Sequence, residues 1–316
     1  NLADVMVHAA LFEAFGLAAL EAANYALPII IPEKSGVTEN FTHGVHGFFP
    51  KKVELAEYKK YVAKLLNDKD LAEKMGRTAR KIVKTKYSWE SHTKRLLSFL
   101  ESHTSPKSEI VVVEIGHALG APLAGGDRLM EPMARKLYQK YNIRVIVSWV
   151  GADHWLTSSY PKEISILPKN IFDSRGSPVP VFITYLLRIW QSTRLMLKYK
   201  HSRQILYSST NILPDVAPAF VTKSLKPDLK WIARIHHLIP PPTSREGRWI
   251  VNFVAFLMQI LSLLMIKSKA DIVIPLNEGL KKKLLENRFS NGKLSVLGAG
   301  INFKNIKNQK VLPNTT

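Results

Sequence analysis

The sequence predicts an α/β protein with parallel sheets, and three observations support this fold class. Short apolar runs alternate with amphipathic helical patterns from end to end of the 316 residues. Several runs, such as residues 109–115, are nearly continuous in Val and Ile, which is typical of strands covered on both faces. A content of 46% hydrophobic and 22% charged residues is that of a folded globular chain.

The first third of the chain reads as a small sheet followed by a helical tail. Residues 4–8 predict a strand, residues 17–26 a helix that ends before Pro28, and residues 28–31 a buried strand. Three amphipathic helices are then expected at residues 55–66, 71–86 and 89–102. Residues 1–102 therefore form one predicted domain, and the polar, proline-containing stretch 103–108 is a predicted linker.

A second α/β domain is predicted over residues 109–302, with a tail at 303–316. Its strands are expected at residues 109–115, 143–149, 164–167, 204–208, 230–235, 271–275 and 293–297. Helices fit between them at residues 128–141, 181–200, 248–267 and 278–286. The alternation predicts a complete Rossmann-like domain.

The composition narrows the chemistry. The chain contains no Cys, which excludes a disulfide framework, a Cys-based zinc site and a thiol nucleophile. No cluster of metal ligands is evident, and no cofactor is expected. The net charge is +20, and most of it lies after residue 108, where the sequence contains 29 Lys and Arg but 13 Asp and Glu. Such a charge favours phosphate-bearing partners, whether a nucleotide diphosphate or an anionic lipid surface. No nucleic-acid-binding module is recognisable, so we expect no nucleic acid partner.

Two carboxylates eight positions apart stand around the start of the first predicted helix. Glu13 precedes the turn Phe15-Gly16-Leu17, and Glu21 lies two helical turns further on. A helix start presents unpaired N–H groups and the positive end of the helix dipole, which together suit a diphosphate. Gly16 removes bulk where the backbone approaches a ligand. The carboxylates can accept hydrogen bonds from sugar and ribose hydroxyls.

This window resembles the retaining glycosyltransferases of family 4, which have a Glu-x7-Glu motif. The resemblance runs through ADVMVHAALFEAFGLAALEAANYALPIIIPEKSGVTENFTHGVHGFFP to the helical tail with Tyr87-Ser88-Trp89-Glu90 and covers about residues 1–102. It implies the GT-B fold of two Rossmann-like domains and a nucleotide-diphosphate sugar as donor substrate. Glu21 would hold the donor ribose and Glu13 the transferred sugar, with backbone amides of Phe15, Gly16 and Leu17 on sugar or phosphate. The alternative is that Glu13 and Glu21 are solvent-exposed residues at an amphipathic helix and have no binding role.

The resemblance implies further site residues. Glu39 lies where the family often has another acidic residue near the donor pocket. Residues 109–302 resemble the N-terminal, acceptor-side domain, in which Gly125 and Gly126 would belong to a turn facing the acceptor cleft. His236 follows the strand at residues 230–235, where it would orient or deprotonate an acceptor hydroxyl. Plain turn glycines and a structural histidine are the alternatives, and the spacing does not favour a dinucleotide-binding loop.

The order of the two domains is the reverse of the usual one. The C-terminal half of a donor domain is followed by an acceptor-side domain, so we expect a segment of a tandem protein with two transferases. The half that would carry the cationic diphosphate clamp is missing, and the segment alone is expected to be inactive or weak. A non-catalytic sugar-nucleotide-binding or scaffold protein is the alternative.

Two apolar stretches raise the question of membrane contact. Residues 249–266 lack charge and reach the length of a membrane span, but a span there would separate neighbouring strands of one sheet. A buried core helix and a helix lying on a membrane remain open. For residues 179–200, with Arg188, Arg194 and Lys198, a core helix with solvated arginines is the favoured interpretation, and a second basic and apolar face is the alternative. We expect a cytoplasmic protein, with peripheral attachment to the cytoplasmic face of a membrane and a lipid-linked or polysaccharide acceptor as hypotheses.

Overall fold

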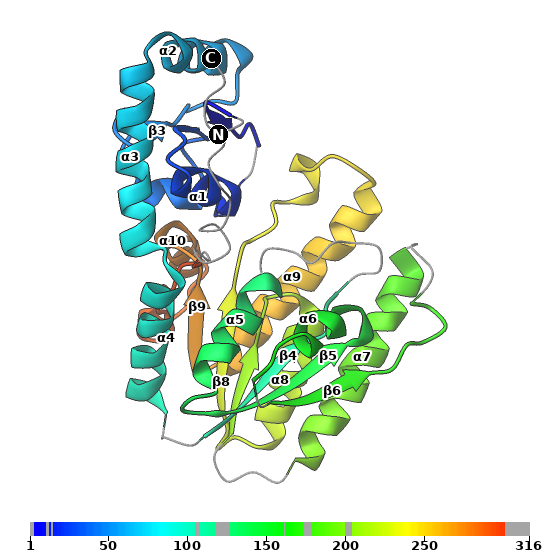
Figure 1. Ribbon diagram of the computed structural model, residues 1–316. Helices are drawn as coiled ribbons and strands as arrows, with labels where there is room; N and C mark the ends of the chain where they lie inside the picture. The colour runs from blue at the N-terminus through cyan, green and yellow to red at the C-terminus, as the bar shows by residue number, and fades with distance from the viewer. Residues whose placement is uncertain are drawn as a thin grey trace. The chain divides into compact units, whose positions relative to one another are not determined.

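The computed structural model describes residues 3–10, 13, 15–104, 108–117, 127–160, 162–173, 178–199 and 204–300. Two compact units divide these residues (Figure 1). The first unit contains the described residues up to Leu96 together with 276–279 and 297–300, and the second contains 97–275 and 280–296. Both are α/β units with parallel sheets, which confirms the predicted fold class.

The first unit has a three-stranded parallel sheet in the order β1-β2-β3. Its strands are β1 (Met6–Val7), β2 (Ile29–Ile30) and β3 (Gly47–Phe48). Its helices are α1 (Leu17–Asn24), the short 3-10 helix η1 (Gly36–Asn40), α2 (Leu55–Asn67), α3 (Lys69–Lys86) and the start of α4 (Trp89–His103). The hydrophobic core between sheet and helices includes Ile30, Phe48, Tyr58, Leu65 and Met75. The sequence pattern did not predict β3, which lies in the Gly- and His-containing stretch 43–47 and its continuation.

A glycine allows α3 to lie directly against the turn that follows α1. A Cβ on Gly76 would lie 1.8 Å from the carbonyl oxygen of Ala26, far inside contact distance. Ala26 itself has a positive φ of 61°, so this turn has little freedom to move away. The position of α1 in the first unit therefore depends on the missing side chain of Gly76.

The second unit has a six-stranded parallel sheet in the order β6-β5-β4-β7-β8-β9. Its strands are β4 (Glu109–Glu114), β5 (Asn142–Ser148), β6 (Glu163–Leu167), β7 (Gln204–Ser208), β8 (Lys230–Ile235) and β9 (Ile272–Pro275). Counted within the unit, the order is 3-2-1-4-5-6, that of a doubly wound Rossmann sheet. Strand order reverses between β4 and β7, which pair from Glu109 with Gln204 to Val113 with Ser208.

Helices cover both faces of this sheet. They are α5 (Asp127–Leu137), the 3-10 turn η2 (Trp149–Gly151), α6 (Ala152–Leu156), α7 (Pro178–Lys198), α8 (Leu213–Leu225), the 3-10 turn η3 (Pro242–Ser244), α9 (Trp249–Lys269), α10 (Glu278–Glu286) and the 3-10 turn η4 (Asn291–Lys293). Figure 1 shows α5 and α6 on one face and α7, α8 and α9 on the other. On that second face, α8 packs between α7 and α9 and against the central strands.

Two elements differ from the sequence prediction. The strand expected at residues 293–297 is absent: η4 occupies its start, and one isolated bridge joins Leu294 to Val273 of β9. The 13-residue helix α8 was not predicted, because it contains Pro214 and Pro218. Pro214 lies in the first turn, where the missing N–H costs no hydrogen bond. Burial of Val216 and its neighbours stabilises the helix despite Pro218.

Candidate functional site

The start of α1 has the geometry of an anion site. Gly16 is the N-cap residue with φ 96° and ψ 47°, in the left-handed region that L side chains rarely adopt. A Cβ there would also lie 3.0 Å from Cγ1 of Val37, whose amide donates to the Phe15 carbonyl at 2.6 Å. As the N-cap residue, Gly16 has no side chain with which to cap α1. The first-turn amides and the positive end of the helix dipole therefore remain for a ligand.

Glu13 is held in place beside this helix start. One oxygen accepts a hydrogen bond from the backbone N–H of Phe15 at 3.0 Å, and the other lies 3.2 Å from Nε2 of His8. Both side chains are about a quarter exposed, so a ligand can reach them. The sequence analysis did not single out His8. Its signal was its position directly after β1, at the carboxyl end of the sheet where ligands of α/β folds bind.

The other predicted donor residues fall on the same short segment. Glu21 is exposed on α1, about one and a half turns after Gly16, whereas Leu17 is half-buried in the first turn. The Phe15 ring is buried edge-on against Tyr87, with ring centroids 5.9 Å apart. Burial of the Tyr87 phenol raises its pKa to about 12, so this aromatic contact involves a neutral ring. The Phe15 side chain is therefore buried, and its backbone N–H and C=O are hydrogen-bonded to Glu13 and Val37, so the contact expected from its amide to a ligand stays a prediction.

Glu39 has a structural partner within the first unit. Its two carboxylate oxygens accept the backbone N–H groups of Glu278 at 2.9 Å and of Gly279 at 2.6 Å. These are the first amides of α10, so Glu39 caps that helix and complements its dipole. The donor-site role expected for Glu39 stays a prediction.

In the second unit a buried carboxylate lies at the point where strand order reverses. One oxygen of Asp215 accepts the backbone N–H groups of Ile115 at 2.7 Å and Gly116 at 2.9 Å, just after β4. The other accepts the hydroxyl groups of Thr210 at 2.6 Å and Ser209 at 3.3 Å, just after β7. Asp215 is 1% exposed. It therefore ties together the carboxyl ends of the two central strands.

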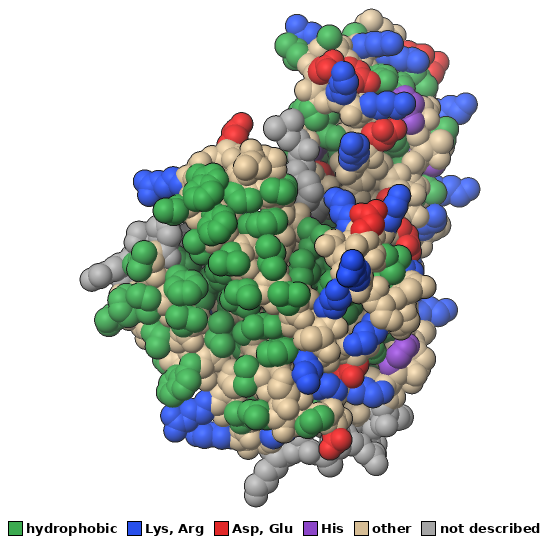
Figure 2. Space-filling view, turned by 180° about the vertical axis from the view of Figure 1, so that it is seen from behind, with side chains coloured by type: hydrophobic (Ala, Val, Ile, Leu, Met, Phe, Trp, Pro, Cys, Tyr) green, Lys and Arg blue, Asp and Glu red, His purple; other side chains and the backbone are tan. Residues whose placement is uncertain are grey.

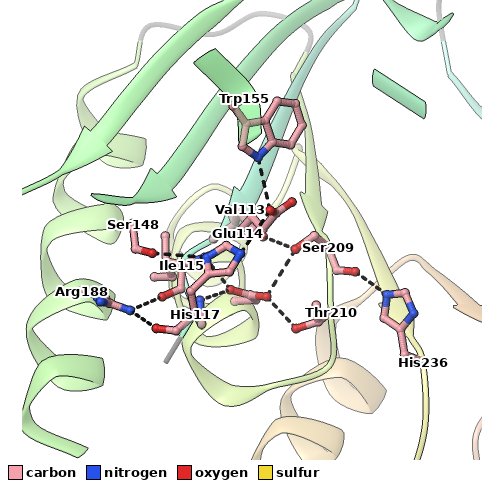
Figure 3. Close-up of polar contacts among 12 residues, drawn as sticks. Val113, Glu114, Ile115, His117, Ser148, Trp155, Arg188, Ser209, Thr210 and His236 are labelled. Carbon is pink, nitrogen blue, oxygen red and sulfur yellow. Dashed lines mark hydrogen bonds and ion pairs between the residues drawn. The ribbon is translucent and has the colours of Figure 1, made fainter. Parts of the chain in front are cut away.

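Arg188 of α7 holds the same segment from the opposite side. One guanidinium nitrogen donates to the carbonyls of Ile115 at 2.9 Å and His117 at 2.6 Å (Figure 3). Another nitrogen pairs with Asp173 at 2.9 Å. Arg188 is 2% exposed. The expectation that Arg188 belongs to a basic surface on residues 179–200 is therefore wrong, because its charge is neutralised inside the unit.

A third polar group completes this edge of the sheet. Glu114, the last residue of β4, is fully buried and accepts a hydrogen bond from the Trp155 indole at 3.2 Å. Nε2 of His117 lies 3.4 Å from the same carboxylate oxygen, and Nδ1 lies 3.2 Å from the hydroxyl of Ser148 (Figure 3). The carboxyl ends of β4 and β5 thus carry a packed network of titratable and hydroxyl side chains.

His236 is buried directly after β8, beside the end of β7. Nε2 lies 2.9 Å from the carbonyl of Ser209, and a carbonyl only accepts, so Nε2 carries the proton (Figure 3). Burial, with a further contribution from the nearby Arg234 charge, lowers the pKa of His236 to about 3. The ring is therefore neutral at physiological pH, and Nδ1 holds its lone pair.

The buried neutral state of His236 makes stability depend on pH. An unfolded histidine titrates near 6.5, so the contribution of His236 is complete above that pH and is lost as pH falls toward 3. Between pH 6.5 and 4.5 we expect the unfolding free energy to fall by about 2–3 kcal/mol more than in His236→Asn. Urea titrations across this range measure the difference. His103→Asn, at an exposed position, is the control and should show the same pH dependence of the unfolding free energy as the unaltered chain. If the unfolding free energy of His236→Asn falls with pH as steeply as that of the unaltered chain, the buried neutral state of His236 is contradicted.

Gly125 and Gly126 lie outside the described residues, whereas Gly116 of the same loop is described. A Cβ on Gly116 would lie 1.9 Å from Cδ1 of Ile212, so the loop begins with a close approach to the segment before α8. Among the residues that the structure describes, no three His, Asp or Glu side chains are grouped to hold a metal ion.

Comparisons with known proteins give one family match, which lies in the first part of the chain. Residues 1–82 match the family described as glycosyl transferases group 1. Sucrose synthase of Melioribacter roseus is 37% identical over 98 residues, which are 30% of this chain and 12% of that protein. An uncharacterized glycosyltransferase of Methanocaldococcus jannaschii is 32% identical over 98 residues, which are 30% of this chain and 25% of that protein. The matched segment thus spans a quarter or less of these relatives.

Among solved structures, sucrose-phosphate synthase from Thermosynechococcus elongatus aligns with 63% of this chain and 49% of its own at 12% identity and a TM-score of 0.42. The sequence matches agree with the resemblance noted for the Glu13 to Glu21 window. Residues 1–82, which contain β1, α1 and the predicted donor residues, are similar to glycosyl transferases of group 1.

Proposed function

We propose that the protein binds a nucleotide-diphosphate sugar at the start of α1 and transfers the sugar, a hexose, to an acceptor hydroxyl with retention of configuration. The observation that carries this proposal is the α1 start itself. Gly16 leaves the first-turn amides without a side-chain cap, and Glu13 and Glu21 stand on either side. The similarity of residues 1–82 to glycosyl transferases of group 1 supports it.

Each part of the proposed donor would meet a group suited to it. The diphosphate carries negative charge toward the amides of the first turn of α1. The Glu13 carboxylate, which the Phe15 amide holds in place, accepts hydrogen bonds from hydroxyl groups of the sugar. The exposed Glu21 carboxylate accepts hydrogen bonds from the two ribose hydroxyls. Backbone amides of Gly16 and Leu17 complete the contacts, and the Phe15 amide acts through Glu13.

In this proposal the second unit is the acceptor side of a second transferase in a tandem protein, so this segment alone is inactive or weakly active. A base with a pKa of about 3 removes protons weakly, so His236 positions the acceptor hydroxyl through Nδ1 rather than deprotonating it. The departing donor phosphate oxygen takes the proton instead, which needs no protein nucleophile. The positive charge of the second half of the chain fits a lipid-linked or polysaccharide acceptor, with the protein on the cytoplasmic face of a membrane.

Calorimetry with a panel of nucleoside diphosphates and sugar nucleotides tests the donor site. Glu21→Ala removes charge-assisted hydrogen bonds to two hydroxyls, so we expect affinity for both ligand types to fall about 10- to 100-fold. Glu57→Ala, on helix α2 of the same unit, is the matched control and should bind like the unaltered chain. Binding that is unchanged in Glu21→Ala would contradict the site. No binding by the unaltered chain would favour the alternative of a non-catalytic scaffold.

A further inference from the structure

Helices α7 and α9 of the second unit present an exposed apolar face on either side of α8. Figure 2 shows hydrophobic side chains gathered over one broad area, with Lys and Arg side chains around it. The α7–α9 face, as we call it, consists of the exposed residues Val179, Phe182, Leu186, Trp190, Trp249, Ile250, Val251, Phe253, Val254, Leu257, Ile260, Leu261 and Leu264. On α7 these residues recur every three or four positions, and on α9 Ile250, Phe253, Leu257, Leu261 and Leu264 do the same, so each set forms a stripe along its helix. Soluble monomers rarely expose an apolar patch of this extent.

A groove runs between the two helices at their N-terminal ends. It has a volume of about 300 Å³, and its walls are almost wholly apolar. Its lining includes Val181, Phe182 and Tyr185 from α7 and Ile250, Val254 and Met258 from α9. A groove with this lining suits hydrocarbon and offers few hydrogen-bonding groups to a polar ligand.

Neither a core helix nor a membrane span describes α9. Its most apolar 18-residue window has a mean hydropathy of 2.2, yet 17% of that window is buried, which rules out the core-helix interpretation. Strands β8 and β9 flank α9 in the chain and pair in parallel, Ile232 with Ile272. A helix crossing a bilayer would carry the ends of these strands to opposite sides. The helix therefore lies along a surface.

The charges beside the face select the kind of surface. Neither α7 nor α9 contains an Asp or Glu. Exposed cations lie at several points around the helices: Arg194, Lys198, Arg248 and Lys269. Glu246, an exposed acidic residue, lies two positions before Arg248 in the turn that precedes α9. Tryptophans at positions 190 and 249 combine apolar bodies with a polar N–H, a pairing suited to the lipid head-group layer.

We propose that the α7–α9 face docks on an anionic membrane, with its apolar side chains in the interfacial layer and its cations on lipid phosphates. Basic residues beside a long apolar surface complement anionic lipid in both charge and polarity. This docking does not depend on sugar transfer. The groove lies at the N-termini of α7 and α9, which is the end of the sheet that carries Asp215 and His236. If the proposed function also holds, membrane docking at this end implies a lipid-linked acceptor.

Sedimentation with vesicles tests the docking without any donor. The full chain should sediment with 7:3 phosphatidylcholine:phosphatidylglycerol vesicles at 50 mM salt and bind pure phosphatidylcholine at least tenfold more weakly. The double variant Phe253→Glu with Leu257→Glu should lose at least tenfold in affinity, since it buries two charges in the interfacial layer. Arg194→Ala and Arg248→Ala should each lose about fivefold. Leu55→Glu, an exposed apolar residue of α2, is the matched control.

Several outcomes would overturn the docking surface. If the double variant and the Leu55→Glu control sediment equally with the vesicles, the α7–α9 face does not bind the membrane. If the unaltered chain does not bind anionic vesicles but is a dimer by light scattering, and the double variant is a monomer, the face is a subunit interface. Circular dichroism and thermal unfolding establish that each variant is folded. Nucleotide calorimetry on the same variants separates this result from the donor-site test, since the substitutions leave the α1 residues unchanged.

Discussion

Replacing Asp215 by Ala is expected to lower the free energy of unfolding of the second unit by about 3–5 kcal/mol. The carboxylate accepts four hydrogen bonds in the interior, from two backbone amides after β4 and two hydroxyl groups after β7. Alanine leaves these donors without their acceptor where water does not reach. The loss should exceed that of a simple cavity, because the amides of Ile115 and Gly116 cannot rotate to find another partner.

Urea unfolding followed by tryptophan fluorescence measures this loss, since five of the six tryptophans lie in the second unit. Asp271→Ala is the matched control. Asp271 also accepts a backbone amide, that of Trp231, and an amine from Lys223, but it is 39% exposed. Its removal should cost about 1 kcal/mol. A loss below that of the control for Asp215→Ala would show that the buried network does not hold the strand ends.

Replacing Arg188 by Met is expected to cost a similar amount, about 3–5 kcal/mol. Methionine fills much of the same volume but leaves the carbonyls of Ile115 and His117 without a donor and Asp173 without its counter-charge. Asp173 keeps hydrogen bonds from the Trp149 indole and an amide, so its burial becomes unfavourable without being wholly unsatisfied.

Arg144→Met is the matched control, since Arg144 pairs with Glu109 and Glu163 but is 20% exposed, and its loss should stay near 1 kcal/mol. Because Arg188 and Asp215 both fix Ile115, the double variant should lose less than the sum of the single losses by at least about 0.5 kcal/mol. Additive losses would mean that the two side chains hold Ile115 independently.

The regular elements were predictable where the periodicity is strong and local. The strands at residues 204–208 and 230–235 and the helix at 278–286 were predicted at the bounds that the structure has. The helix α8 escaped because its prolines disfavour helix in isolation, while burial between α7 and α9 stabilises it in the fold. The expected strand at residues 293–297 failed for the converse reason. Its apolar residues suit a strand, but its backbone forms one bridge to β9.

The candidate site divides in the same way. Glu13, Gly16 and Glu21 belong to one short window, so a local pattern predicts them together. Arg188 and Asp215 have no such pattern, because they reach Ile115 across 73 and 100 positions of the chain. Neither residue type is unusual for its helix when read alone. Only the order of the strands, with β4 beside β7, brings them together.

Tyr185 belongs both to the apolar groove and to the segment after β4. Its ring lines the groove, and its hydroxyl donates to the Gly116 carbonyl at 3.0 Å. Lipid that moves this ring changes the free energy of the Gly116 segment, and a ligand that reorders that segment changes the groove. Linkage makes the two effects equal: the factor by which lipid alters ligand affinity is the factor by which ligand alters lipid affinity. If the α7–α9 face docks on a membrane as proposed, the Tyr185 contact couples that docking to ligand binding at the strand ends.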